Sequence, residues 1–295
     1  ESDFDARVRP WVQSYLRIPL NTPEGYRPND ASVGDLDHDG EYEIVVHQVG
    51  RSRDNSQRGF TDAPVLEAYE LDGTLLWRIT LGINIREGAH YTQFIVYDLD
   101  GDGSAEIASK TADGTVDGAG NIIGDPDADW RNEQGYVLAG PEYLTIFDGN
   151  TGAALATTQY IPPRHPHTLT PSAEQLDELW GDGYGNRVDR FLAAVAYLDG
   201  TRPSLIMTRG YYTRAVLAAW NWRDNELNHV WTFDTDDGTP GHAAYRGEGN
   251  HNLSVGDVDA DGRDEIMFGA AAIDDDGTGL YATGLGHGDA MHLSD

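Results

Sequence analysis

The sequence of 295 residues predicts an all-β fold, a β-propeller of four-stranded blades with calcium-binding loops. Three observations predict it. An acidic D-x-D-x-D-G pattern occurs three times, each copy lies between short hydrophobic runs typical of strands, and hairpin turns rich in Gly, Asp and Asn follow. Four strands per repeat with loop insertions favour a propeller, whose blades bury their faces against one another. A solenoid or a stacked sandwich is the alternative architecture.

Each acidic loop reads D-x-D-x-D-G-x-x-E, so its carboxylates crowd together. Such groups raise one another's pKa unless a cation lies among them, and Ca²⁺ prefers several oxygen ligands on a tight turn. The early glutamate and the flanking strands distinguish this loop from an EF-hand. We predict several structural Ca²⁺ ions, with these ligands: Asp35, Asp37, Asp39 and Glu43; Asp98, Asp100, Asp102 and Glu106; Asp257, Asp259, Asp261 and Glu265.

The spacing of the loops indicates four repeat units. The gap between the second and third loops is too long for one unit, and residues 190–210 fill it with a strand-loop-strand pattern. There Tyr197–Gly200 aligns with the acidic loops but lacks their ligands. A further segment, 161–180, reads as an insertion with a short helix over 172–179, and its His165 and His167 are interpreted as solvated.

The domain prediction is a propeller over 27–295, preceded by a linker or closing strand over 1–26. Residues 284–295 are similar to 247–257, so a fifth unit begins at the end of the sequence. Half a blade would leave an unpaired edge, and we therefore expect a longer protein. A swap in which "RPWVQSYLRIPL" completes the last blade is the alternative.

Charge and composition exclude several classes of partner. The formal net charge of −30 would repel nucleic acid and anionic membranes. No apolar run approaches the roughly 18 residues of a membrane span. With no cysteine there is no disulfide framework, and a first residue other than Met fits a removed signal peptide or a trimmed chain. We expect a monomer.

The propeller geometry assigns the loops to two faces. The acidic turns join the first strand of each unit to the second, whereas the loops that enter the first strand and leave the second share the other face. That second set contains His90, His251, His287, Lys110, Arg187, Arg209, Arg214, Tyr91, Tyr211 and Tyr212. Basic residues gathered there suit an anionic ligand, and aromatic rings suit sugars. The alternatives are local ion pairs for the arginines and structural hydrogen bonds for the histidines.

Six stretches of the sequence, at 29–46, 88–115, 183–200, 202–223, 249–266 and 279–295, resemble bacterial rhamnogalacturonan lyases of polysaccharide lyase family 11. The resemblance implies an eight-bladed ring with many calcium ions, of which this chain would be about the first half. It also implies a secreted, extracellular enzyme that cleaves between rhamnose and galacturonate in rhamnogalacturonan I by β-elimination. A non-catalytic calcium-stabilised propeller that binds acidic polysaccharide or mediates adhesion is the alternative.

The same resemblance implies site residues. His251 and His287 match family histidines and are assigned to the reaction centre, as metal-linked or general-base groups. We add Lys110 to the catalytic set from the loop argument, and we predict substrate binding by Arg209, Tyr212, Arg214, Asn252 and His90. One Ca²⁺ ion could also serve catalysis. Residues 45–56 and 62–69 depart from the family pattern, which puts sugar binding by the first unit in doubt.

Overall fold

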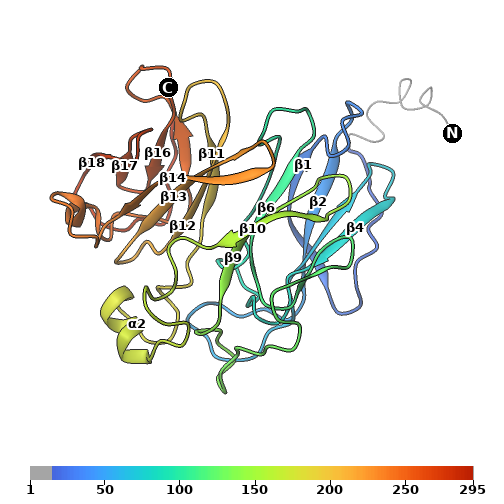
Figure 1. The fold of residues 1–295 in the computed structure, drawn as a ribbon, viewed down its shortest axis with the longest axis horizontal. Coiled ribbons are helices and arrows are strands. Elements are labelled where there is room, and N and C mark those ends of the chain that lie inside the picture. Colours follow the sequence, from blue (N-terminus) through green and yellow to red (C-terminus); the bar gives the residue numbers. More distant parts are fainter. Residues whose placement is uncertain (1–14, 295) are drawn as a thin grey trace.

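The computed structural model describes residues 15–294, which fold into four antiparallel sheets (Figure 1). The first sheet has the order β1-β2-β3-β4-β7-β8, and the other three have four strands each. In Figure 1 the sheets follow the chain across the molecule, from the blue first sheet to the red fourth. The all-β prediction is therefore confirmed for the described residues.

The strand bounds follow the predicted repeat. The first sheet contains β1 (Arg27–Gly34), β2 (Glu43–Val49), β3 (Val65–Tyr69), β4 (Leu75–Thr80), β7 (Thr115–Val116) and β8 (Ile122–Ile123). The second contains β5 (Phe94–Tyr97), β6 (Glu106–Ala112), β9 (Glu142–Phe147) and β10 (Ala154–Gln159). The third contains β11 (Ala193–Ala196), β12 (Ser204–Arg209), β13 (Val216–Arg223) and β14 (Glu226–Asp234), and the fourth β15 (Ser254–Gly256), β16 (Glu265–Phe268), β17 (Ala271–Ile273) and β18 (Gly279–Ala282).

Three hydrophobic cores hold consecutive sheets together. Successive residues of a strand face opposite sides of its sheet, so one strand can serve two cores. On β6, Ile107 packs toward the first sheet and Ala108 toward the third. On β12, Leu205 faces the second sheet and Ile206 the fourth. This double burial explains why the inner strands read as continuous apolar runs rather than as alternating patterns.

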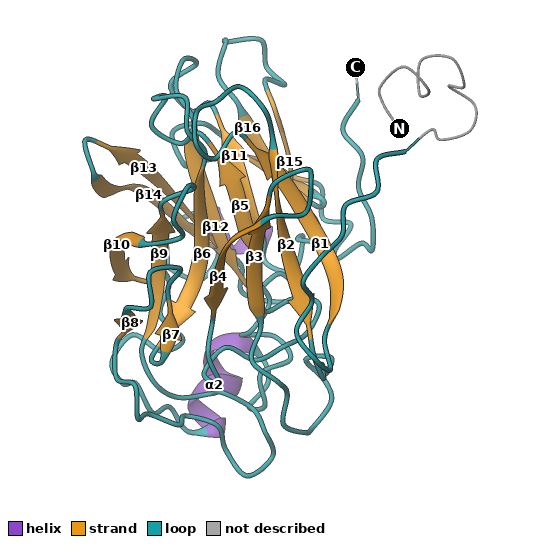
Figure 2. Ribbon diagram, turned by 90° about the vertical axis from the view of Figure 1, so that its right-hand side faces the viewer, coloured by secondary structure: helices purple, strands orange, loops and turns teal. Residues whose placement is uncertain are grey.

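The first strands of the four sheets lie side by side, because β1 contacts β5, β5 contacts β11, and β11 contacts β15 (Figure 2). Each of these strands runs from a loop that precedes it to the turn that follows it. The acidic turns are the β1–β2, β5–β6 and β15–β16 connections, as the sequence predicted. The preceding loops are therefore separated from the acidic turns by the length of a strand.

The propeller prediction was wrong. The structure has four separate antiparallel sheets that do not close into a ring, and in the described part of the chain no hydrophobic core joins the fourth sheet to the first. The prediction of an eight-bladed ring is contradicted by the same observation. The repeat pattern determines which strands pair and which sheets pack together, but closure depends on the angle at each shared core, which the pattern does not encode.

The first sheet also departs from the four-stranded repeat. The hairpin β7–β8 comes from the second repeat yet pairs with β4, through Thr80 opposite Val116. It covers the outer edge of the first sheet, and such cover protects an unpaired strand edge. Sequence periodicity missed it because its strands have only two residues each.

Helix α2 (Ala173–Trp180) lies at one end of the stacked sheets (Figure 2). Ser172 caps it, accepting from the backbone N–H of Gln175, whose side chain accepts from the Ser172 backbone in return. The buried face of the helix, with Leu176 and Trp180, packs against the sheets. The predicted helix over 172–179 is confirmed within one residue.

A short 3₁₀ helix, η1, spans His242–Tyr245. Across residues 15–294, none of the helices has the length and apolarity needed to span a membrane. The predicted first loop aspartate of a fifth unit, Asp295, and residues 1–14 lie outside the described residues.

Candidate functional site

Loops that are far apart in the sequence meet at the end of the sheets opposite the acidic turns. We define the histidine cluster as His90, Arg190, Tyr211, Tyr212, His251 and His287. His90 precedes β5, Arg190 precedes β11, the tyrosines follow β12, and His251 and His287 flank the fourth sheet. The predicted convergence of His90, His251, His287 and Tyr212 at one end is therefore what the structure shows.

Tyr211 lies at the centre of the histidine cluster. Its side chain is fully buried, and its hydroxyl lies 3.1 Å from Nδ1 of His251 and 3.3 Å from Nδ1 of His90. Nη1 of Arg190 donates to the same oxygen at 3.4 Å. Because the hydroxyl has one proton, it can donate to only one of the two imidazoles and must accept from the other.

The hydrogen bonds of His287 fix the direction of this network. Its Nδ1 donates to the carbonyl of Gly249 at 2.6 Å, so in the neutral ring Nε2 is an acceptor. Nε2 of His251 lies 3.3 Å away and must then donate. It follows that Nδ1 of His251 accepts from Tyr211, and that Nδ1 of His90 donates to Tyr211. This assignment leaves a lone pair on Nε2 of His90.

Burial keeps two of these imidazoles uncharged. Desolvation, aided by the positive charge of Arg190, lowers the pKa of His90 to about 4. Desolvation and the neighbouring His287 also lower the pKa of His251. The permanent positive charge of the cluster belongs to Arg190, whose guanidinium lies 5.3 Å from the ring centroid of Tyr212. Neutral imidazoles beside a fixed cation can accept a proton at neutral pH while the cation holds an anion.

One face of the cluster could hold a metal ion. Nitrogens of His251 and His287 and a carboxylate oxygen of the exposed Asp289 all lie within 4.8 Å of one another. Two imidazoles and one carboxylate suit a transition-metal ion better than Ca²⁺, which prefers oxygen ligands. Metal binding would require both Nε2 atoms to be free of protons, and the hydrogen bond between Tyr211 and His251 would then reverse its direction.

The acidic turns share one hydrogen-bond pattern. The glutamate at position 9 accepts from the backbone N–H of position 2: Glu43 from Leu36 at 2.6 Å, Glu106 from Leu99 at 2.8 Å, and Glu265 from Val258 at 2.7 Å. The first aspartate accepts from the N–H groups of positions 5 and 6, as in Asp35 with Asp39 and Gly40. Three loops of different sequence thus fold alike.

The oxygen atoms of these turns fit a hard cation. Carboxylate oxygens converge in the groups Asp35, Asp37 and Asp39; Asp98, Asp100 and Glu106; and Asp257, Asp259 and Glu265. One carboxylate oxygen of Glu265 is buried without a hydrogen-bond partner, and burial raises the pKa of Glu106 to about 8. A Ca²⁺ ion would satisfy these oxygens and stabilise their charged form. Asp275 also reaches the third turn, a contribution that the loop motif could not reveal.

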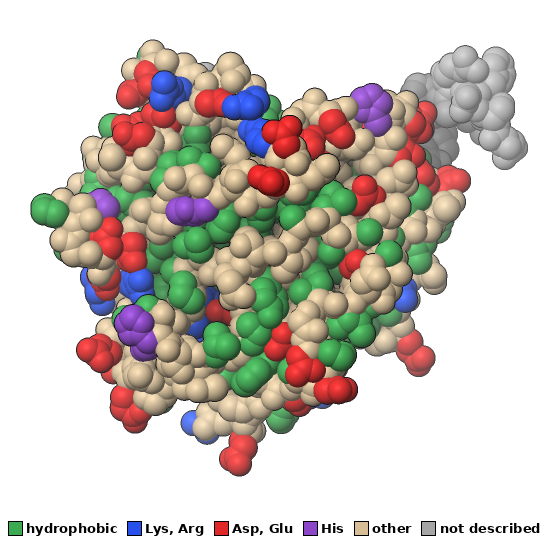
Figure 3. Space-filling model, viewed as in Figure 1, with side chains coloured by type: hydrophobic (Ala, Val, Ile, Leu, Met, Phe, Trp, Pro, Cys, Tyr) green, Lys and Arg blue, Asp and Glu red, His purple; other side chains and the backbone are tan. Residues whose placement is uncertain are grey.

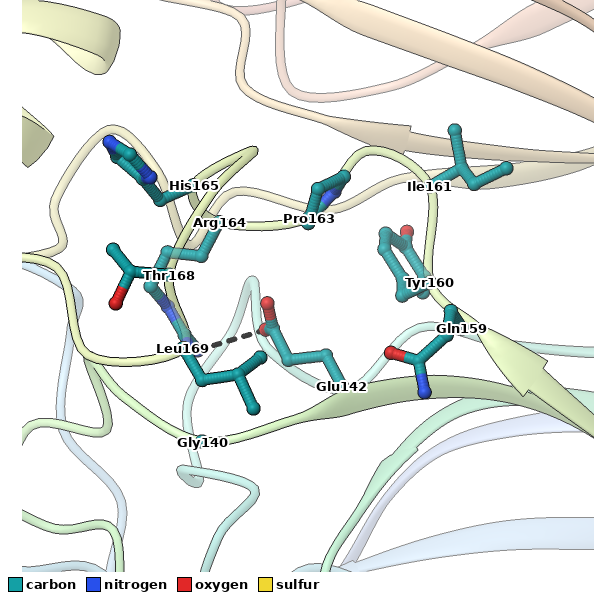
Figure 4. A pocket seen from close by; sticks show the side chains of 10 residues that line it. All are labelled: Gly140, Glu142, Gln159, Tyr160, Ile161, Pro163, Arg164, His165, Thr168 and Leu169. Carbon is teal, nitrogen blue, oxygen red and sulfur yellow. Dashed lines mark hydrogen bonds and ion pairs between the residues drawn. The ribbon is translucent and has the colours of Figure 1, made fainter.

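Two predicted site residues lie in a second group, which we call the Glu142 cluster: Lys110, Glu142, Arg164, Asp189 and Arg209. Lys110 lies 3.0 Å from Oε1 of Glu142, and Arg209 lies 2.5 Å from the same atom. A pocket of about 240 Å³ borders Glu142 and Arg164 (Figure 4). The structure therefore pairs Lys110 and Arg209 internally, and their predicted contact with substrate stays a prediction.

The remaining predicted residues do not join the hydrogen bonds of the histidine cluster. Arg214 forms a two-point ion pair with Asp234, at 3.0 and 2.6 Å. The Asn252 side chain donates to the carbonyl of Met291 at 3.1 Å. Arg187 lies over the ring of Tyr212, at 5.6 Å from its centroid.

Sequence reasoning missed Arg190 and Asp289. Arg190 ends the loop 183–190, which was expected at this end, yet nothing in the sequence distinguishes it from Arg187. Burial distinguishes them, because Arg190 is 4% exposed and donates through Nε to the carbonyl of Asn186 at 2.6 Å. Asp289 comes close to His251 and His287 only because of the turn that follows β18, which the sequence does not reveal.

Charge is distributed unevenly over the surface. Figure 3 shows hydrophobic side chains toward the middle of one face and acidic side chains around its periphery. Few basic side chains are visible there, consistent with 20 Lys and Arg against 50 Asp and Glu. Arg190 of the histidine cluster is therefore an exception in an acidic molecule.

The fold and site define a class of protein: repeated antiparallel sheets with cation-type acidic turns at one end and a site of histidine, tyrosine and arginine at the other. The chain belongs to rhamnogalacturonan lyase family 11, whose C-terminal domain matches residues 15–295. The resemblance seen in the sequence is thus confirmed.

Named relatives agree with this assignment. The chain is 58% identical over 306 aligned positions to the rhamnogalacturonan exolyase YesX of Bacillus subtilis, covering 100% of this chain and 48% of YesX. It is 57% identical to the rhamnogalacturonan endolyase YesW of the same organism, covering 100% of this chain and 47% of YesW. A Bacillus licheniformis rhamnogalacturonan lyase structure superposes with a TM-score of 0.89 and 58% identity, over 95% of this chain and 48% of that one. The chain spans about half the length of these relatives.

Proposed function

We propose that this chain is part of a rhamnogalacturonan lyase, which cleaves between rhamnose and galacturonate in the rhamnogalacturonan I backbone by β-elimination. The observation that carries the proposal is the convergence of three histidines, two tyrosines and Arg190 at one end of a chain from this lyase family. Exolyase and endolyase relatives are almost equally similar, so they support the reaction type and not one mode of attack.

The reaction needs a base and a positive charge. The C5–H of galacturonate is weakly acidic, and its proton leaves more readily when the neighbouring carboxylate is neutralised. The proton passes to the base, the C4–O bond to rhamnose breaks, a C4=C5 double bond forms, and the departing oxygen takes up a proton. No oxidant or co-substrate is required.

The histidine cluster supplies both requirements. His90 and His251 are uncharged at neutral pH because their pKa values are lowered. His90 has the free Nε2 lone pair in the hydrogen-bond assignment above, while His251 could accept a proton if its tautomer reversed. Arg190 provides a positive charge, and Tyr212, half-buried beside it, provides a ring face for a sugar.

Metal ions complete the proposal. The twelve carboxylates predicted in the acidic turns would hold Ca²⁺ and fix the connections between first and second strands. At the histidine end, His251, His287 and Asp289 would hold a divalent ion, which when bound supplies further charge to neutralise the galacturonate carboxylate. Because such an ion reverses the bonds of Tyr211, Nε2 of His90 would then carry the proton, so the ion and the His90 base belong to alternative states of the site. In our proposal the protein is secreted, and the acidic turns stabilise it outside the cell.

The test is direct. The complete natural protein is incubated with rhamnogalacturonan I and Ca²⁺, and the ultraviolet absorbance of the unsaturated uronate is followed. The proposal predicts a steady rise, whereas a flat trace together with measurable polysaccharide binding would identify a binding protein instead. Polygalacturonate, which lacks rhamnose, is the matched control and should give no rise.

A further inference from the structure

Three cations converge on a single carboxylate oxygen beneath the histidine cluster. Oε1 of Glu142 lies 3.0 Å from Lys110, 2.9 Å from Arg164 and 2.5 Å from Arg209. These cations come from β6, from the loop after β10 and from the end of β12. Glu142, on β9, therefore ties together three parts of the chain that are not neighbours in sequence.

The Glu142 cluster is buried and contains one more cation than carboxylates. Its five residues are each at most 7% exposed. Asp189 is the second carboxylate, 3.8 Å from Nε of Arg164 and 3.9 Å from Nη2 of Arg209. Three cations thus face two carboxylates. Removing the charge of Glu142 would leave three buried cations with one carboxylate, and an unpaired buried charge is strongly unfavourable.

Short backbone links connect this cluster to the histidine cluster. Asp189 directly precedes Arg190, and Arg209 stands two residues before Tyr211. The N–H of Gly210 donates to the carbonyl of Arg190 at 2.7 Å, which joins the two segments. The N–H of Phe191 donates to the carbonyl of His90 at 3.2 Å.

The ring of Phe191 provides a second connection. Nζ of Lys110 lies 4.7 Å from its centroid, and the guanidinium of Arg209 lies 4.8 Å from it. The cations paired with Glu142 therefore also support the residue that follows Arg190. A shift of Glu142 would be transmitted to segments 189–191 and 209–212, which place Arg190, Tyr211 and Tyr212.

We propose that Glu142 is a positioning residue for the reaction centre. Its ion pairs hold segments 189–191 and 209–212 so that Arg190 and Tyr211 face His90 and His251. This inference rests on the proposed lyase function. It gives Lys110 and Arg209 a supporting role, in place of direct contact with the galacturonate carboxylate.

The experiment compares Glu142→Gln with Glu67→Gln in the complete natural protein. Glu67 is the matched control, because it is fully buried on β3, is also paired with an arginine, Arg78 at 2.5 Å, and belongs to the first sheet. Thermal unfolding establishes a temperature at which both variants are folded. At that temperature, kcat and KM on rhamnogalacturonan I are measured from the absorbance of the product.

Glu142→Gln is expected to lower kcat by roughly ten- to a hundredfold with little change in KM, because small misplacements at a reaction centre are costly. Glu67→Gln should lose stability and keep its kcat. If Glu142→Gln fails to fold, the double variant Glu142→Gln/Arg164→Met removes one cation with the carboxylate and restores the charge balance. With the same excess of one cation as the wild type, this variant should fold and still show the lower kcat.

Three outcomes would overturn the inference: a folded Glu142 variant with wild-type kcat, an equal loss of kcat in Glu67→Gln, or a lower KM at unchanged kcat. The last would mean that the freed cations reach the substrate. An inactive wild-type protein would overturn the proposed function and this inference with it, whereas an active wild type with an active Glu142→Gln overturns the inference alone.

Discussion

Tyr211 and His251 are joined by a hydrogen bond of 3.1 Å between the buried hydroxyl and Nδ1 of the imidazole. The tyrosine follows β12 in the third sheet, and the histidine precedes β15 in the fourth. The same hydroxyl reaches His90 of the second sheet at 3.3 Å. One oxygen atom therefore connects loops from three sheets, and its proton sets which imidazole nitrogens are free.

Replacing Tyr211 by Phe should lower kcat by roughly ten- to a hundredfold, because the imidazoles of His90 and His251 lose their common partner. The expected loss of stability is about 1–2 kcal/mol, since Arg190 also loses an acceptor. Steady-state kinetics and denaturant unfolding measure the two effects.

The control for this variant is Tyr69→Phe. Its hydroxyl is also fully buried and donates to Glu67 at 2.6 Å, but it lies in the first sheet. Equal losses of kcat in both variants would show that the Tyr211 hydroxyl acts only through stability.

Removing divalent ions should destabilise the protein. A chelator leaves the converging oxygens of the three acidic turns without a cation, so the melting temperature should fall, and excess Ca²⁺ should restore it. Asp257→Asn should reduce the response to Ca²⁺, because it removes one of these ligands. Differential scanning calorimetry with and without chelator measures both.

Glu178→Gln is the matched control for Asp257→Asn, since Glu178 is exposed on α2, outside any acidic turn. Its response to Ca²⁺ should equal that of the wild type. A melting temperature unaffected by chelation would contradict structural ions in the turns.

The metal-free protein should lose stability as the pH rises. Burial raises the pKa of Glu106 to about 8 from 4.5, so over that window the folded state binds more protons than the unfolded state. The stabilisation is complete below pH 4.5 and is lost as the pH rises through 8, by roughly 2–4 kcal/mol. Denaturant unfolding in chelator across this range measures it.

Two controls accompany the pH series. Glu106→Gln does not titrate and should flatten the profile, and Ca²⁺ should do the same by stabilising the charged carboxylate. A metal-free protein that gains stability between these pH values would contradict the account of Glu106.

The sequence predicted strands and turns well because their signals are local. The D-x-D-x-D-G turns, the connections that they form and the capped helix at Ser172 all follow from residues a few positions apart. The ring did not follow, because closure depends on packing angles between sheets. The hairpin β7–β8 was also missed, since two-residue strands have no periodicity to detect.

The site was predicted only in part, because loop order can be inferred from the sequence whereas the partner of a buried side chain cannot. Loop order brought His90, His251 and His287 to one end, because entering and leaving loops alternate along antiparallel strands. It could not distinguish Arg190, which joins the cluster, from Arg209, which turns inward to Glu142. The partner of a buried arginine is a tertiary property, and a basic residue at the right end of a strand can face either way.

The most direct test of the division between the two ends is the turnover of His251→Ala on rhamnogalacturonan I, measured beside Asp35→Asn at saturating Ca²⁺. The account predicts that His251→Ala, with its melting temperature near that of the wild type, loses turnover by about a hundredfold or more. Asp35→Asn should keep its turnover once Ca²⁺ is saturating. Wild-type turnover in folded His251→Ala would contradict the assignment of elimination to the histidine cluster.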